Sequence, residues 1–321
     1  MSALYPFLLR PEFVERPWGA RDLSPVYPEH PCEKAVGEVW LTGDENRVAN
    51  GPLAGRTLGE LCREYGRALV GESARETERF PLLIKFLFPR EKLSVQVHPD
   101  DEAARRVGQP CGKTECWYVL AADPGAQVAL GLKPGVTREQ LARAIQEVRA
   151  EELLNWVEIH AGEMIYVDAG TVHTIGPGSI LVETQQNSDT TYRLYDYGRP
   201  REIHVEQGLA ATKERTRAGK MPREGATLVS SSCFLVEKFS LKETRCFEAA
   251  HSPQIFVALA GSGAAEAASP ASLGRGEVLV VPADVMQVRI RPNDDLEMLR
   301  MTLPAEPMPQ PKTTLGVGKS E

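Results

Sequence analysis

The sequence predicts an all-β fold with two jelly-roll barrels in tandem and a few short helices. Many short, strand-like runs alternate with turn residues, whereas few stretches show helical periodicity. A glycine, a five-residue strand, a tight turn and a polar side chain follow one another in the first half, and the same spacing returns in the second half. A polar, charged segment separates the two halves, as expected of a linker.

Composition and charge narrow the class of protein. The 321 residues are 42% hydrophobic and 25% charged, which is typical of a soluble globular protein. The 37 basic and 44 acidic residues give a net charge of −7, which argues against nucleic acid or an anionic membrane as the main partner. The N-terminus has no signal-peptide pattern, no run is apolar enough to span a bilayer, and the six cysteines form no CxxC pair. We therefore expect a cytoplasmic monomer or homodimer that acts on a small molecule.

Three helices are expected in the first half, at 57–69, at 101–106 and from Thr137 onward. The first has its leucines and a tyrosine on one face, as an amphipathic helix requires. The third opens with a capping-box pattern that joins Thr137 to Gln140.

The strands of the first half are expected at 36–41, 81–88, 93–98, 112–120, 127–131, 156–159, 163–167, 179–184 and 190–195. Lys85 lies inside one apolar run, where a lysine is rarely buried without a partner. It either reaches solvent from an edge strand or points into a pocket. Trp18 lies in a turn within 12–24 and is either a core aromatic or a pocket wall.

The second half has fewer distinguishing features. Strands are expected at 228–239, 254–259, 277–281, 286–290 and 296–301, and 260–276 is expected to form a long loop or a hairpin tip. The domains are accordingly predicted as a first domain at 1–212, a linker at 213–226, a second domain at 227–304 and a loose tail at 305–321.

The strand at 93–98 has one apolar and one polar face. Successive side chains on a strand point to opposite sides, so Ser94, Gln96 and His98 share a face that Val95 and Val97 do not. A row of polar groups on an inward face is unfavourable unless something binds them. A metal ion or a polar ligand would both do so.

A second polar position follows a tight turn. The strand 163–167 ends at the turn 168–170, and His173 begins the next strand. This resembles the second cupin motif, although Asp168 stands where that motif has proline. The second half repeats the spacing, but Gln287 takes the place of the histidine and no His-x-His precedes it. We therefore expect only the first barrel to bind a metal.

The first cupin motif is matched by Gln96, His98 and Glu115, with glutamine in place of the usual first histidine. Each histidine alone is better interpreted as structural, but His98, Glu115 and His173 together indicate a metal site. Two imidazoles, a carboxylate and an amide oxygen suit zinc. Two histidines and one carboxylate also form the facial triad of non-haem iron oxygenases, so the residues leave the metal open.

The sequence as a whole resembles the type I mannose-6-phosphate isomerases of the short bacterial kind. The resemblance covers most of residues 10–205 and rests on these segments in order: 17–19, Lys85, 93–100, 112–115, 168–173, Glu183 and 187–199. The large helical insertion of that family is missing, and only the helix after Thr137 occupies its place.

The resemblance implies one zinc ion per chain, held by Gln96, His98, Glu115 and His173, and an aldose–ketose isomerisation of a sugar phosphate through an enediol. It further implies catalytic roles for Arg193, Lys113 and Glu183, and substrate-binding roles for Trp18, Lys85, Ser94 and Arg199. Arg199 is otherwise a solvated loop charge, and Glu183 the polar end of a strand. The catalytic base is left open among Glu183, a zinc-bound water, His98 and Lys113.

Two other functions are compatible with the same residues. An iron-dependent cupin oxygenase would use the facial triad, and a non-enzymatic sugar-binding cupin would use the metal for structure alone. Lys113 and Arg193 favour the isomerase, because that reaction needs cations for a phosphate and for a developing oxyanion.

Overall fold

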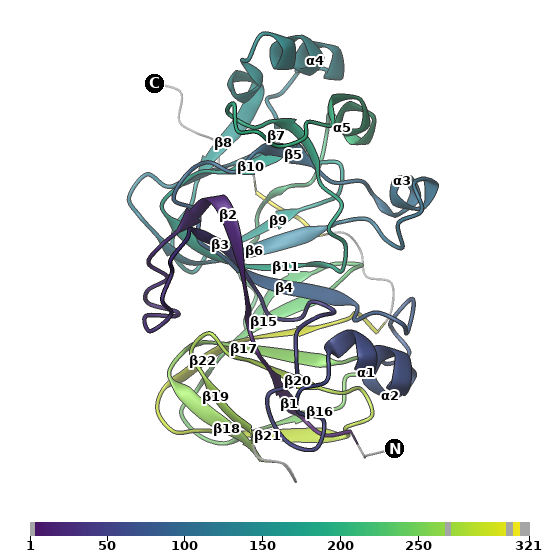
Figure 1. Ribbon diagram of the computed structural model, residues 1–321, viewed down its shortest axis with the longest axis vertical. Coiled ribbons are helices and arrows are strands. Elements are labelled where there is room, and N and C mark those ends of the chain that lie inside the picture. Colours follow the sequence, from purple (N-terminus) through teal and green to yellow (C-terminus); the bar gives the residue numbers. More distant parts are fainter. Residues whose placement is uncertain (1–3, 267–270, 306–310, 315–321) are drawn as a thin grey trace.

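Four β-sheets stack as two pairs, one above the other in Figure 1. The computed structural model describes residues 4–266, 271–305 and 311–314. The upper pair has a seven-stranded sheet, in the order β13 (Gly219–Lys220), β9 (Met164–Val167), β6 (Glu115–Ala122), β11 (Ser179–Gln186), β4 (Leu82–Leu87), β3 (Val36–Trp40) and β2 (Glu12–Ala20). Facing it is a five-stranded sheet, in the order β12 (Tyr192–Tyr195), β5 (Val95–Val97), β10 (His173–Ile175), β7 (Gln127–Leu132) and β8 (Leu154–Glu158).

The lower pair repeats this arrangement. Its larger sheet has the order β1 (Phe7–Leu9), β20 (Val278–Val281), β17 (Gln254–Ala260), β22 (Leu296–Thr302), β15 (Leu235–Leu241) and β14 (Thr227–Ser230). Its smaller sheet has the order β16 (Arg245–Glu248), β21 (Gln287–Pro292), β18 (Ser262–Glu266) and β19 (Ala271–Gly274). Neighbouring strands run antiparallel in both pairs, so the all-β prediction is confirmed.

The helices are short and lie outside the sheets: α1 (Leu58–Tyr65), α2 (Arg67–Val70), α3 (Asp101–Arg106), α4 (Arg138–Gln146), α5 (Val205–Ala211) and the 3₁₀ turn η1 (Ala150–Leu153). Both side chains of the predicted capping box at Thr137 form their hydrogen bonds. The predicted helix 57–69 is split, because Gly66 has φ +49° and ends α1 before α2 begins. None of the helices in the described residues is long and apolar enough to cross a membrane.

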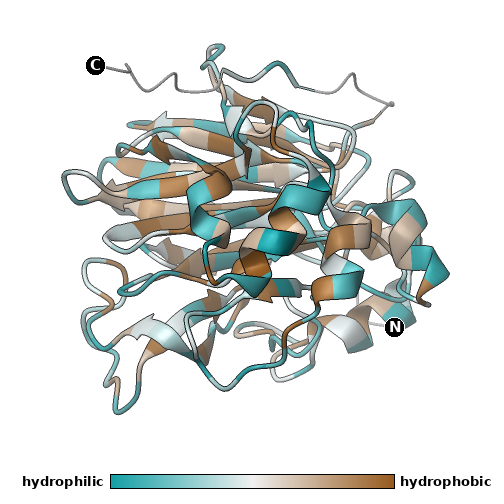
Figure 2. Cartoon of the chain, turned by 90° about the horizontal axis from the view of Figure 1, so that it is seen from above, coloured by the Kyte–Doolittle hydropathy of each residue, from teal (hydrophilic) through white to brown (hydrophobic). Residues whose placement is uncertain are grey.

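Several segments differ in detail from the sequence-based expectation. The predicted turn around Trp18 is an irregularity inside β2, whose pairing with β3 shifts between Glu15 and Ala20. The stretch 260–276 forms the hairpin of β18 and β19, and residues 267–270 of that stretch lie outside the described part. The strands carry much of the brown, hydrophobic colour in Figure 2, whereas the helices mix hydrophobic and hydrophilic residues.

The chain crosses its predicted domain boundaries at three places. The strand β1 pairs with β20 and so completes the larger sheet of the lower pair, although it lies at the start of the sequence. The predicted linker 213–226 contains β13, which extends the seven-stranded sheet through its pairing with β9. Thr314, from the predicted tail, exchanges two backbone hydrogen bonds with Lys220 at 2.8 and 2.9 Å.

One apolar cluster runs through the contact between the two pairs. It contains Phe86 and Tyr118 from the upper pair and Val236 and Ile255 from the lower pair, all of them buried. Burial of large side chains on both sides of a contact is typical of a permanent interface rather than of domains on a flexible tether. The upper pair, with its site, is therefore held rigidly on the lower pair.

Candidate metal centre and cavity

The five-stranded sheet brings three polar residues into one row. Gln96 on β5 lies opposite His173 on one side and opposite Arg193 on the other. His98 follows directly after β5, and the rings of His98 and His173 lie 4.9 Å apart. The apolar face of β5 packs in a cluster with α4 residues such as Leu141, so its polar face turns toward the seven-stranded sheet.

The seven-stranded sheet supplies the facing row. Glu183 on β11 lies between Trp117 on β6 and Lys85 on β4, and Lys85 in turn lies opposite Trp40 on β3. Glu115 begins β6, where the two sheets come together. Antiparallel register therefore gathers residues from four strands at one place, although they are up to about 140 positions apart in the sequence.

His98, Glu115 and His173 form a buried group whose ligand atoms all lie within 4.8 Å of one another. The Nδ1 atoms of the two histidines lie 2.9 Å from the backbone oxygens of Thr190 and Thr171. Each Nδ1 therefore carries the proton, which leaves the Nε2 lone pairs directed at Glu115. The Oε1 atom of Glu115 is buried and accepts no hydrogen bond from the described residues.

The pKa values of both histidines are lowered, which keeps them in the neutral form that binds a cation. Burial lowers the pKa of His173 to about 4, and burial together with the ammonium of Lys113 lowers the pKa of His98 well below its usual value. Both imidazoles are therefore neutral at pH 7, as metal ligation requires. With a buried carboxylate oxygen that lacks a hydrogen bond beside two neutral imidazoles, this donor set fits a divalent metal ion.

Lys113 lies against the group. Its Nζ is 3.2 Å from Nε2 of His98, 2.5 Å from Oε2 of Glu115 and 3.9 Å from Oε1 of Glu183. Burial opposes its charge, but the two glutamates outweigh burial and raise its pKa. Lys113 therefore stays protonated while almost fully buried.

A ladder of alternating charges extends from Lys113 to the rim. Glu183 lies 3.7 Å from Lys85, and Lys85 lies 3.5 Å from Glu38. Glu38 also accepts two hydrogen bonds from Arg16, at 2.9 and 3.1 Å. Burial raises the pKa of Glu183 despite the neighbouring lysines. Glu38 differs, because Lys85 and Arg16 outweigh its burial and lower its pKa to about 2.

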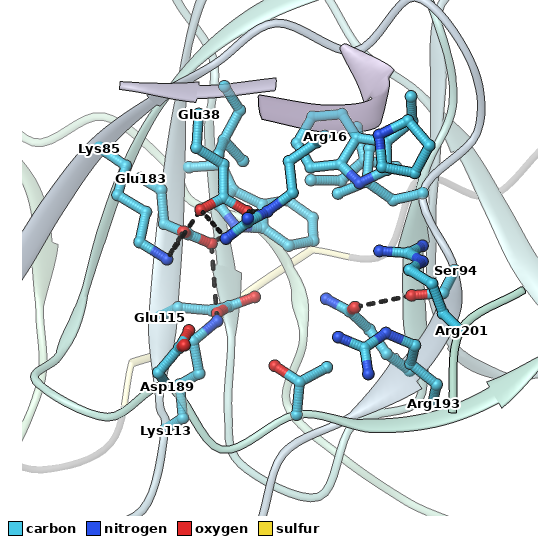
Figure 3. A pocket seen from close by; sticks show the side chains of 18 of the residues that line it. Arg16, Glu38, Lys85, Ser94, Lys113, Glu115, Glu183, Asp189, Arg193 and Arg201 are labelled. Atoms are coloured by element: carbon cyan, nitrogen blue, oxygen red, sulfur yellow. Dashed lines mark hydrogen bonds and ion pairs between the residues drawn. The ribbon is translucent and has the colours of Figure 1, made fainter. Parts of the chain in front are cut away.

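These residues border a cavity of about 450 Å³ between the two sheets (Figure 3). It is lined by most of the residues that the sequence indicated: Trp18, Lys85, Ser94, Gln96, Lys113, Glu115, Glu183 and Arg193. The histidines His98 and His173 are only 1% exposed and do not belong to the lining. The structure thus places the indicated metal ligands and the indicated substrate residues in and beside one cavity.

Arg199 is the exception among the indicated residues, because it does not line the cavity. Its guanidinium bonds to Asp196 and donates to the backbone oxygen of Lys92 at 2.7 Å. Arg201 lines the cavity in its place.

Sequence reasoning also missed Arg16 and Glu38. Glu38 could have been found, because it is a charged residue inside the strand predicted at 36–41, just as Lys85 is a charged residue inside an apolar run. Arg16 directly precedes the segment 17–19 and carried no signal of its own.

Comparison with known proteins identifies relatives along nearly the whole chain. Residues 7–125 match the family model described as phosphomannose isomerase type I, catalytic domain. The mannose-6-phosphate isomerase of Streptococcus mutans is 33% identical over 312 residues, which span 92% of this chain and 97% of that protein. The mannose-6-phosphate isomerase ManA of Bacillus subtilis is 41% identical over 215 residues, which span 64% of this chain and 67% of that protein.

A solved structure agrees with these sequence matches. The crystal structure of the mannose 6-phosphate isomerase from Bacillus subtilis superimposes with a TM-score of 0.83 at 30% identity. The superposition covers 93% of this chain and 99% of that one. Both sheet pairs are therefore part of the shared architecture, and not only the pair that contains the cavity.

Proposed function

This chain belongs to the type I phosphomannose isomerases, and we propose that it interconverts mannose 6-phosphate and fructose 6-phosphate in the cavity of the upper sheet pair. The observation that carries the proposal is the convergence of His98, Glu115 and His173 beside a cavity that is also lined by Lys113 and Glu183. A metal group without proton-transfer residues would suit a structural site, whereas this combination suits catalysis.

The proposed cofactor is one zinc ion per chain. His98, Glu115 and His173 would hold it, and Gln96 would be the fourth ligand. The amide nitrogen of Gln96 lies 3.2 Å from Nε2 of His173, so a half-turn of the amide directs its oxygen toward the same point. When bound, the ion polarises the sugar carbonyl and stabilises the negative charge that develops on its oxygen.

The chain's own residues would move the proton. The reaction takes a proton from carbon 2 of the aldose and returns it to carbon 1, through an enediol, while a second proton passes between the two oxygens. Glu183 is the best-placed base among the candidates, because it lines the cavity and its raised pKa suits both accepting and releasing a proton. Lys113 remains charged beside Glu183, so it would stabilise the enediolate through a charged hydrogen bond.

A coupled assay of fructose 6-phosphate formation from mannose 6-phosphate tests the function directly. We expect turnover in the zinc-loaded protein, loss of turnover with a chelator and recovery on adding zinc. Glu183→Gln should abolish turnover and the exchange of the carbon 2 proton with deuterated water, while zinc content stays at one per chain. Metal-loaded wild-type protein without turnover would disprove the proposal. Bound iron together with oxygen consumption would instead support the oxygenase.

A further inference from the structure

We infer that Arg201 binds the phosphate group of the substrate and that the buried carboxylate of Asp196 positions it. The inference rests on the proposed function for the identity of the ligand, a sugar phosphate monoester. Its structural basis is one wall of the cavity, formed by Ser94, Arg193 and Arg201 and called here the arginine wall. Figure 3 shows these three side chains on one side of the cavity, opposite Lys85, Glu183 and Glu115.

Asp196 holds the guanidinium of Arg201 in one orientation. The Nε and Nη2 atoms of Arg201 donate to the two carboxylate oxygens of Asp196 at 2.6 and 2.7 Å. Asp196 is 2% exposed, so water does not compete for this pair. Within the described residues, Nη1 of Arg201 forms no hydrogen bond or ion pair. Arg201 therefore presents an immobilised cation with a free donor, which reduces the entropy lost when an anion binds.

Arg193 is the second cation of the wall, and it lacks an acidic partner. Its Nε atom is buried without a hydrogen bond, and the described residues form no ion pair with it. Burial lowers its pKa, and the neighbouring charges of Arg201 and Arg16 lower it further, against the opposite effect of Asp196 and Asp189. Like charges that converge on a partly buried wall repel one another, so a bound anion would stabilise this arrangement.

The charge of the wall suits an anionic group. Its two guanidinium groups, those of Arg193 and Arg201, line the cavity, and the one buried carboxylate beside them, Asp196, is shared between Arg201 and Arg199, so it does not neutralise the wall. The other carboxylates nearby, Asp189 and Glu91, belong to exposed residues. A phosphate monoester carries about −1.5 to −2 charges at pH 7 and accepts the forked hydrogen bonds of arginine. Glu115 and Glu183 lie on the opposite side of the cavity (Figure 3), where the sugar carbons would react.

The chain contains a matched pair for testing this assignment. Arg199 and Arg201 both bond to Asp196, but only Arg201 lines the cavity. A role in holding Asp196 would be shared by both arginines, whereas phosphate binding belongs to Arg201 alone.

The experiment compares Arg201→Gln with Arg199→Gln in the zinc-loaded protein. We measure kcat and KM for mannose 6-phosphate and, by calorimetric titration, the Kd for inorganic phosphate. For Arg201→Gln, the loss of a charged hydrogen bond predicts a KM and a phosphate Kd that rise about tenfold or more, with kcat within about threefold of wild type. For Arg199→Gln we expect rises below about threefold. Arg201→Lys, which keeps the charge but not the fork, should restore part of the affinity.

Two results would overturn the inference: Arg201→Gln with unchanged KM and phosphate Kd, or equal effects of the two glutamine variants. Thermal melting of each variant shows whether it is folded, and Arg201→Lys replaces Arg201→Gln if the latter is not. The titration needs no turnover, so it separates the two proposals. Wild-type protein that binds phosphate through Arg201 but does not isomerise would refute the proposed function alone, whereas an active enzyme indifferent to Arg201 would refute this inference alone.

Discussion

The two sheet pairs share an arrangement of strands but enclose opposite kinds of interior. The upper pair buries His98, Lys113 and Glu115. The lower pair is filled by an apolar cluster that includes Phe256 and Met298, both with no exposed surface. Such a filled interior is the ordinary way to stabilise two packed sheets. The upper pair departs from it at a cost in desolvation, and a cluster of buried ionisable groups beside a cavity is typical of a place where a ligand binds.

The two interiors differ because the strands that follow two similar turns face different ways. His173 and Gln287 each stand eleven residues after a glycine, at Gly162 and Gly276. His173 is buried, whereas Gln287 is exposed and its Oε1 accepts a hydrogen bond from Sγ of Cys246 at 3.5 Å. In β21 the residues that point inward are Val288 and Ile290. Equal spacing in the sequence therefore does not ensure the same facing on a strand, because a shift of one residue reverses it.

The largest expected effect separates the two pairs at these positions. His173→Ala removes one proposed metal ligand, so metal content should fall from the proposed one per chain to near zero and kcat by about 10³-fold. Gln287→Ala should change neither quantity, because its side chain faces solvent. Elemental analysis and the isomerase assay measure both. Equal metal loss in the two variants would mean that the pairs do not differ as described.

The reverse experiment targets the apolar interior. Phe256→Ala leaves a cavity in the lower pair and should reduce the free energy of unfolding by about 3–5 kcal/mol. Metal content and kcat at low temperature should stay near the wild-type values. Urea unfolding followed by circular dichroism gives the change in stability. Loss of the metal without a loss of stability would contradict the division of roles.

Charge rather than volume is tested by Glu38→Gln. The pKa of Glu38 is lowered from 4.5 to about 2 by Lys85 and Arg16, so its charged form stabilises the folded state above about pH 4.5. This contribution, on the order of 3 kcal/mol, is lost as the pH falls from 4.5 toward 2. Wild type should therefore lose its advantage over the variant in this range.

Unfolding free energies at pH 7, 4 and 2.5 measure the effect of Glu38→Gln. The matched control is Glu237→Gln, which removes the 3.0 Å partner of Arg300 in the lower pair. We expect the control to change stability by about 1 kcal/mol or less. A constant difference between wild type and Glu38→Gln at all three pH values would rule out the assigned linkage.

The smallest expected effect concerns the contact between the pairs. The hydroxyl of Tyr27 donates to the backbone oxygen of Gly276 at 2.6 Å, and so ties the segment after β2 to the lower pair. Tyr27→Phe should reduce the free energy of unfolding by about 1 kcal/mol and keep a single unfolding transition. Calorimetry distinguishes this outcome from two separate transitions, which would indicate that the two pairs unfold independently.

The sequence predicted those features that depend on neighbouring residues. Alternation along 93–98 placed Gln96 and His98 on one face, and the box at Thr137 placed the start of α4. The family was also predicted, because its motifs are short and occur in a fixed order. In each of these cases the decisive interactions lie within a few positions along the chain.

Features decided by distant contacts could not be predicted in this way. Arg199 and Arg201 lie in one loop without periodicity, and only the geometry at Asp196 determines which of them lines the cavity. The ladder through Glu38 depends on the register between β3 and β4, which the local pattern does not fix. The split between α1 and α2 is a different case, because it depends on a single residue. Glycine commonly ends a helix, so Gly66 could have predicted it.

The strand β1 has a consequence for how the protein is made. Its partner β20 lies about 270 positions further along, so the ribosome has released nearly all of the polypeptide before the two can meet. Until then the backbone N–H and C=O groups of β1 have no strand partner and are open to pairing with strands of other chains. Pairings of such long range form slowly. We expect the nascent protein to rely on chaperones at this stage, and a version that begins after residue 10 to leave an exposed edge on β20.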